Sequence, residues 1–181
     1  TQSAYLIDQV SAWVSEISPG VRLSATVIPS LLSAELRVRY DADMLTTSDI
    51  SPVNVGFGIP YVLPIIVELL IAQPGDLVVL ENPESHLHPR GQVTIARLIA
   101  QTAARGVQVI CESHSDHIIN GVRLAVKQGV LDADELLVAY FELDEYQDTC
   151  IHHIEVDSKG ALSSYPDGLL DEWGVLMAQL I

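Results

Sequence analysis

The sequence is poor in basic residues, in cysteine and in long apolar runs. Its 181 residues include 9 Lys and Arg against 24 Asp and Glu, for a net charge of −15. Because phosphate groups are bound by basic patches, this balance argues against direct nucleic-acid binding by this segment. Two cysteines, Cys111 and Cys150, cannot form a disulfide framework, so we expect a reducing, cytoplasmic location.

No apolar run reaches the roughly 18 residues of a membrane-spanning helix. The run that comes closest, 58–72, contains Pro60, Pro64 and Glu68, and therefore predicts a core helix and no membrane partner. Hydrophobic residues make up 49% of the chain, which predicts a substantial core. The chain opens at Thr1 without Met, and we expect it to be a fragment of a larger protein.

The acidic residues are unevenly distributed. Twelve of them lie between Asp132 and Glu172, where Lys159 is the only basic residue. Two interpretations of this stretch stay open: a solvated acidic face, or a docking surface for a basic partner.

Hydrophobic periodicity divides the chain into three segments, 1–52, 53–131 and 132–181. The first predicts a helix and an antiparallel strand pair, followed by a loop: 4–17, 21–27, 34–40 and 41–52. The second alternates helix and strand: 59–72, 77–80, 90–104, 107–111 and 116–127. The third is an acidic extension with two strands and a terminal helix: 136–141, 150–156 and about 167 onward.

Two short apolar strands in the middle segment end in polar residues. The strand 77–80 leads into Glu81, and the strand 107–111 leads to His114. A strand, a helix and a second strand in this length form a parallel crossover, which is almost always right-handed. Because parallel strands end on one edge of a sheet, and ligands bind at that edge, Glu81 and His114 should share a site.

Four segments around these strands carry a family resemblance. Leu77–Glu84 resembles a Walker B segment, Ser85–His88 the D-loop, Ser113–Ser115 the switch-histidine loop, and 55–58 a divergent signature loop. Their order and spacing resemble the C-terminal half of an ABC-type ATPase head. The closest branch is the prokaryotic OLD-like and SMC-like AAA ATPases, including predicted ATPases that end in a small uncharacterised domain.

The resemblance implies a partial P-loop NTPase of the ABC type, an α/β fold with a mostly parallel sheet. It implies that Glu81 holds Mg²⁺, which neutralises phosphate charge on ATP, and that His114 contacts the γ-phosphate. It also implies a homodimer with ATP sandwiched between heads, which gates an effector or a nuclease partner. There, Gly56, Phe57 and Gly58 would approach the partner subunit's ATP, and His88 would lie at the dimer interface.

The sequence departs from this pattern in two ways. It contains no Gly-x-x-x-x-Gly-Lys-Ser/Thr loop, so we expect the Walker A lobe in a missing N-terminal part and little ATPase activity from this segment alone. In the position of the usual catalytic Glu stands Asn82, whose amide can position a water but cannot accept its proton. Glu84 is then either the base or a residue that orients the loop.

Two alternatives to the ATPase hypothesis remain open. The first is a metal-dependent zinc hydrolase, whose ligands would come from a group of polar residues near the strand ends: Glu84, His86, His88, His114, Asp116 and His117. The second is a non-catalytic interaction domain that uses the acidic tail.

Overall fold

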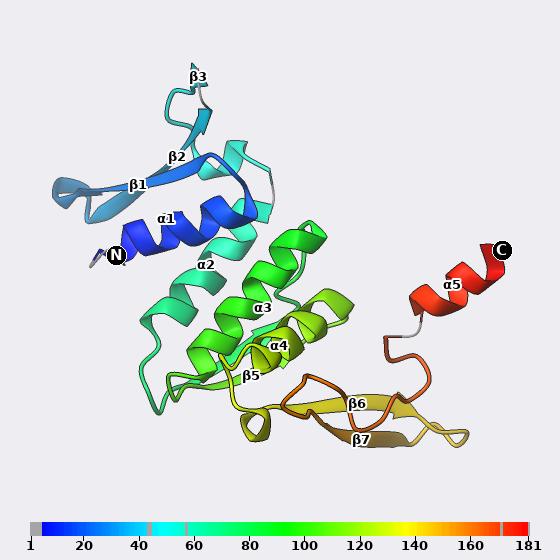
Figure 1. Cartoon of the computed structure of the whole chain (residues 1–181). Helices are drawn as coiled ribbons and strands as arrows, with labels where there is room; N and C mark the ends of the chain where they lie inside the picture. Colours follow the sequence, from blue (N-terminus) through cyan, green and yellow to red (C-terminus); the bar gives the residue numbers. More distant parts are fainter. Residues whose placement is uncertain (1–4, 43–44, 57, 171, 181) are drawn as a thin grey trace. The chain divides into compact units, whose positions relative to one another are not determined.

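The computed structural model describes residues 5–42, 45–56, 58–170 and 172–180 (Figure 1). The chain forms two compact units, Thr1–Gly121 and Val122–Ile181, and each unit buries apolar side chains of its own. Among the described residues no helix is both long and apolar enough to cross a bilayer.

The first unit begins with the predicted helix and strand pair. Helix α1 spans Leu6–Ile17, and β1 (Val21–Ile28) pairs antiparallel with β2 (Ser33–Ala42). The prediction of a loop over 41–52 is wrong in part, because β2 continues to Ala42 and pairs there with β3 (Leu45–Thr46). Ile50 also bridges Val38 in the middle of β2. This backbone pairing satisfies N–H and C=O groups of the segment.

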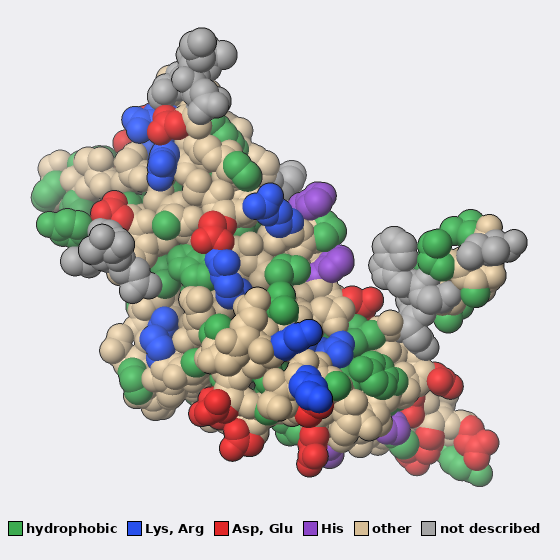
Figure 2. Space-filling view, viewed as in Figure 1, with side chains coloured by type: hydrophobic (Ala, Val, Ile, Leu, Met, Phe, Trp, Pro, Cys, Tyr) green, Lys and Arg blue, Asp and Glu red, His purple; other side chains and the backbone are tan. Residues whose placement is uncertain are grey.

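A short 3₁₀ turn, η1 (Pro29–Leu31), closes this hairpin with an apolar tip. Val27, Leu31 and Leu32 are 71%, 70% and 97% exposed. Figure 2 shows hydrophobic side chains gathered at this end of the hairpin.

From residue 52 to residue 127 the chain alternates helices and strands, as predicted. The elements begin with a 3₁₀ turn and follow in the order η2 (Pro52–Asn54), α2 (Gly58–Ile71), β4 (Leu77–Glu81), α3 (Pro89–Ala103), β5 (Gln108–Glu112) and α4 (Asp116–Lys127). Strands β4 and β5 pair in parallel, which confirms the crossover. Among the described strands, β4 and β5 form the parallel pair, and the other two sheets are antiparallel. The mostly parallel sheet that we expected therefore consists of two strands in this part of the chain.

The β4–β5 sheet is buried on one face only, although residues 77–80 and 109–111 are continuous apolar runs in the sequence. Val78 and Leu80 are 3% and 7% exposed, but Leu77 and Val79 are 55% and 66% exposed, and Ile110 is 51% exposed. Successive side chains of a strand point to opposite faces, so the exposed face ends in the last residue of each strand.

The buried face rests on a core in which α1, α2 and α3 contact one another. Fully buried side chains include Val14, Val62, Ile66, Leu69, Ile95 and Leu98. Thr102, on α3, donates a 3.1 Å hydrogen bond to the Leu69 carbonyl, and Arg105, just after the helix, donates a 2.8 Å hydrogen bond to the same oxygen. This carbonyl lies in the last turn of α2, where helical partners run out, so α3 caps α2 and fixes its position.

The second unit is built on an antiparallel hairpin of β6 (Leu137–Leu143) and β7 (Thr149–Glu155), which follows a 3₁₀ turn, η3 (Ala133–Glu135). Its outer face is apolar and exposed at four residues: Leu137, Phe141, Leu143 and Ile151. The terminal helix α5 (Glu172–Leu180) begins later than the expected 167, because the Asp167 carbonyl accepts a hydrogen bond from the Tyr140 hydroxyl within a turn.

Residues 157–160 form a turn after β7. The Asp157 carboxylate accepts 2.8 Å hydrogen bonds from the backbone N–H groups of Lys159 and Ala161. The bond from Ala161, followed by that from Lys159, lowers the pKa of Asp157 below its ordinary value. Gly160 adopts a φ of +76°, and a Cβ there would lie 2.6 Å from the Arg123 carbonyl oxygen, so the turn requires glycine.

Candidate functional site

The two parallel strands end in carboxylates that lie side by side. Glu81 is the last residue of β4, Glu112 is the last residue of β5, and the two are register partners. Both side chains are exposed. The sequence singled out Glu81 and missed Glu112, although the same signal, an acid that closes an apolar strand, was present for both.

His114 lies at the same sheet edge, as the crossover predicted. Its Nε2 atom is 3.1 Å from Oε1 of Glu112, and its side chain is 84% exposed. The imidazole therefore rests against a carboxylate at the strand end while remaining accessible to a ligand from solvent.

Glu84 joins the segment after β4 to the loop after β5. Its Oε2 accepts a 2.8 Å hydrogen bond from the Ser113 hydroxyl, and its Oε1 accepts a 2.9 Å hydrogen bond from the backbone N–H of His114. Both carboxylate oxygens thus hold the loop that carries the histidine. Of the two roles left open by the sequence, this geometry favours the orienting one.

Asn82 turns the chain out of β4 with a φ of +47°. Asn adopts this left-handed region more readily than Glu, which gives a backbone reason for the amide in this position. Its N–H donates to the Glu112 carbonyl at 3.0 Å, and its own carbonyl accepts from the Tyr61 hydroxyl at 3.1 Å. Asn82 therefore links both strands to α2.

The two described glycines of the predicted signature loop differ in their surroundings. A Cβ on Gly58 would lie 2.8 Å from the His86 carbonyl oxygen, whereas a Cβ on Gly56 would meet nothing within 4 Å. Close approach of α2 to the 82–86 turn thus explains Gly58 without a ligand, and Gly56 is the glycine that stays open to one. Phe57, predicted to bind ATP with them, lies outside the described residues.

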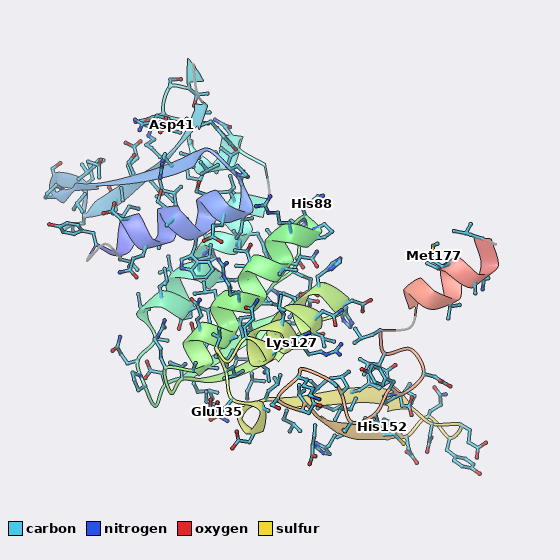
Figure 3. All side chains as sticks on the ribbon, in the orientation of Figure 1. Asp41, His88, Lys127, Glu135, His152 and Met177 are labelled. Carbon is cyan, nitrogen blue, oxygen red and sulfur yellow. The ribbon has the colours of Figure 1, made fainter. Side chains whose placement is uncertain are left out.

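His88 is the N-cap residue of α3 and is exposed. Figure 3 shows it at the amino-terminal end of that helix. Its side chain makes no capping hydrogen bond, so it is available to a partner at this end of the site.

Cys111 lies one residue before Glu112, on the covered face of β5. Burial, and after it the nearby carboxylates of Glu84 and Glu112, together raise the pKa of its thiol to about 12. At neutral pH this cysteine is a protonated, structural residue and a poor nucleophile.

The donors at the strand ends fit a divalent cation. Mg²⁺ is bound in nucleotide sites by one or two carboxylates together with phosphate oxygens, and Glu81 and Glu112 provide adjacent exposed carboxylates. When bound there, the ion would neutralise charge on a nucleotide's phosphates.

The zinc-hydrolase alternative finds no corresponding geometry. Over the part of the chain that the structure describes, no group of three or more His, Cys, Asp or Glu is placed to hold a metal ion. Within the same part, His86 packs edge-on against Tyr61 with ring centroids 5.4 Å apart, and Asp116 opens α4.

Two sequence families match the chain. The family described as "AAA domain, putative AbiEii toxin, Type IV TA system" matches residues 36–120, and "Protein of unknown function (DUF3696)" matches residues 131–180. None of the curated proteins matches the chain.

Several solved structures share the fold. One, from a study of ATP-driven dimerization and DNA-stimulated activation of SMC ATPases, has a TM-score of 0.57 and 11% identity, and the match covers 97% of this chain and 90% of that one. An Smc head bound to the C-winged helix domain of ScpA has a TM-score of 0.59 and 11% identity, with 83% and 42% covered. The Smc head of Pyrococcus furiosus with an extended coiled coil has a TM-score of 0.54 and 10% identity, and the match covers 97% of this chain and 37% of that one.

At these identities the likeness shows the fold, and this chain spans less than half of the two longer Smc heads. The order of strand-end acid, turn, helix, strand and histidine loop is the part that was recognisable in the sequence. Together with the AAA family match over residues 36–120 and the shared fold, this order supports the resemblance to a partial ABC-type, SMC-like AAA ATPase head.

Proposed function

We propose that this chain is the carboxyl-terminal part of an ATPase head that dimerises around ATP and Mg²⁺ and gates an effector or nuclease. The observation that carries the proposal is the pair of carboxylates, Glu81 and Glu112, that end adjacent parallel strands beside the exposed His114. A phosphate group drawn to a cation held by these acids would come within reach of that imidazole.

The absence of a Walker A loop in the sequence means that the β- and γ-phosphates need a cradle from other residues. We propose that the segment bearing this loop packs on the exposed face of the β4–β5 sheet. That face presents Leu77, Val79 and Ile110 to solvent and ends in the two carboxylates. Covering it would bury the apolar side chains and bring the phosphate cradle to the metal-binding edge.

Asn82 makes slow hydrolysis the expected behaviour. No carboxylate follows Glu81 directly, and Glu84 is engaged at both oxygens, so a water would be positioned without a strong base. The dimer would then persist for as long as ATP remains bound, which suits a gate better than a rapid motor.

The test uses the protein that carries both this chain and a Walker A lobe, in one polypeptide or as co-expressed parts. Mg²⁺-dependent ATP hydrolysis should fall by about 10²-fold in Glu81→Gln and His114→Ala. Glu68→Gln, an exposed carboxylate on α2, is the matched control and should leave the rate unchanged. An active enzyme that is indifferent to both site substitutions would refute the proposal.

Dimerisation is measured separately by light scattering. The unsubstituted protein should form a dimer with ATP and Mg²⁺. Glu81→Gln should weaken this dimer because it removes a carboxylate that would hold the ion, and His88→Glu should weaken it by placing an acidic group at the exposed N-cap of α3. A dimer that forms equally without nucleotide would contradict the sandwich arrangement.

A further inference from the structure

Gln92, on the first turn of α3, joins two loops that lie far apart in the sequence. Its Nε2 donates a 2.9 Å hydrogen bond to the Leu87 carbonyl, and its Oε1 accepts a hydrogen bond from the Ser115 hydroxyl. Leu87 belongs to the segment 85–88 that precedes α3, and Ser115 ends the histidine loop, 113–115, that precedes α4. The glutamine is half-buried between them.

The surrounding hydrogen bonds fix the direction of this amide. The Leu87 carbonyl can only accept, and the Ser115 oxygen already accepts a 3.1 Å bond from the His117 N–H, which leaves the hydroxyl hydrogen for Gln92. The position thus needs a donor and an acceptor on one planar group. Glutamine supplies both, and neither glutamate nor an apolar residue of equal length does.

Glu84 makes a second connection between the same two loops. It binds Ser113 and His114 at the front of the histidine loop, while Gln92 binds Ser115 at its back. Leu87, between the two connections, is 9% exposed and anchors the segment in the core. The histidine loop, 113–115, is therefore held at its front by Glu84, which precedes segment 85–88, and at its back by Gln92, which follows that segment.

From these contacts we infer that Gln92 is a positioning residue that makes the two loops move as one body. The inference rests on the proposed function for its consequence: a displacement of His88 at the dimer interface would displace His114 at the phosphate, and the reverse. Whether ATP is bound or hydrolysed in one head would thus affect the dimer contact through Gln92, a side chain that would contact neither the nucleotide nor the partner subunit.

The loop coupling is tested on this chain by hydrogen exchange with mass spectrometry. Gln92→Met keeps the length of the side chain and removes both hydrogen bonds, and it should raise exchange about tenfold in both 85–91 and 113–118. Gln101→Met is the matched control, because Gln101 lies on the same helix and makes no side-chain hydrogen bond within the described part of the chain. It should leave both segments unchanged.

A second variant keeps the test decisive if Gln92→Met fails to fold. Gln92→Glu retains the acceptor for Ser115 but sets a carboxylate oxygen against the Leu87 carbonyl. Coupled loops should then lose protection at 113–118 as well as at 85–91. Faster exchange at 85–91 alone, or in neither segment, would overturn the inference.

The consequence for catalysis is measured in the protein with its Walker A lobe. Gln92→Met should keep the KM for ATP within about twofold and lower kcat about tenfold, because the phosphate-facing histidine is mispositioned while the nucleotide-binding groups are intact. Equal loss of kcat and of ATP affinity would overturn the positioning role. If the unsubstituted protein binds no ATP, the proposed function fails, and the exchange experiment still decides whether the loops are coupled.

Discussion

Glu84 offers the sharpest separation between a catalytic base and a positioning residue. The substitution Glu84→Gln keeps Oε1 as an acceptor for the His114 N–H, and the Ser113 hydroxyl can rotate to accept from the new amide. Glu84→Ala removes both bonds. Because hydrogen bonds to a charged acceptor contribute about 1.5–3 kcal/mol each and Glu84 is only half-buried, we expect a cost of about 2–3 kcal/mol for Ala and about 1 kcal/mol or less for Gln.

Stability is measured by urea denaturation, followed through the fluorescence of Trp13 in a Trp173→Phe background. Trp13 lies on α1, in the unit that contains the site, and Arg97 stacks 4.8 Å from its ring centroid. The midpoint should fall in the order wild type, Gln, Ala at unchanged slope. A slope that changes would mean that the compactness of the denatured or the native state has changed, or that unfolding is no longer two-state.

Activity is then compared in the protein with its Walker A lobe. If Glu84 holds the histidine loop, Glu84→Gln should retain hydrolysis within about fivefold, while Glu84→Ala loses more. If Glu84 is instead the catalytic base, Glu84→Gln should lower the rate of hydrolysis about 10²–10⁴-fold. A Gln variant that is natively stable and as inactive as the Ala variant would refute our reasoning and assign Glu84 the proton.

Three further predictions follow from single side chains. The pKa of Cys111 is raised from 9.0 to about 12, so above pH 9 the unfolded chain loses a proton that the folded chain keeps. The free energy of unfolding should therefore fall by up to about 1.4 kcal/mol per pH unit until the folded thiol ionises. Urea midpoints of the wild type and of Cys111→Ala, measured across this pH range, test the prediction. The pKa of Asp157 is lowered, so its stabilisation is present above its ordinary pKa of 3.8 and is lost as the pH falls through the folded value. The acid-induced loss of exchange protection at the Lys159 and Ala161 amides, which donate to this carboxylate, should vanish in Asp157→Asn. Gly58→Ala should cost about 1–3 kcal/mol by driving its Cβ into a backbone carbonyl, whereas Gly56→Ala should leave the urea midpoint unchanged; equal effects would contradict the packing explanation.

Much of the secondary structure was readable from the sequence. The period of 3.6 in α1 and the period of 2 in β1 and β2 are local signals, and the turn glycines mark where each element ends. The crossover rule then placed Glu81 and His114 on one sheet edge without any coordinates. In the two short strands, apolar residues occupy both faces, so no alternation shows which face is buried. The sequence therefore could not show that Leu77, Val79 and Ile110 are exposed.

The side-chain connections of the site were decided by tertiary structure alone. Glu84 meets Ser113 because β4 and β5 pair in parallel and both residues follow the strand ends. Gln92 meets Ser115 where α4 packs closely on α3, at Gly121, where a Cβ would lie 2.5 Å from the Cβ of Ala96. Contacts across more than twenty residues depend on this packing and leave no periodic trace. The sequence by itself determined which chemical groups reach the sheet edge, and the fold decided which of them hold the others in place.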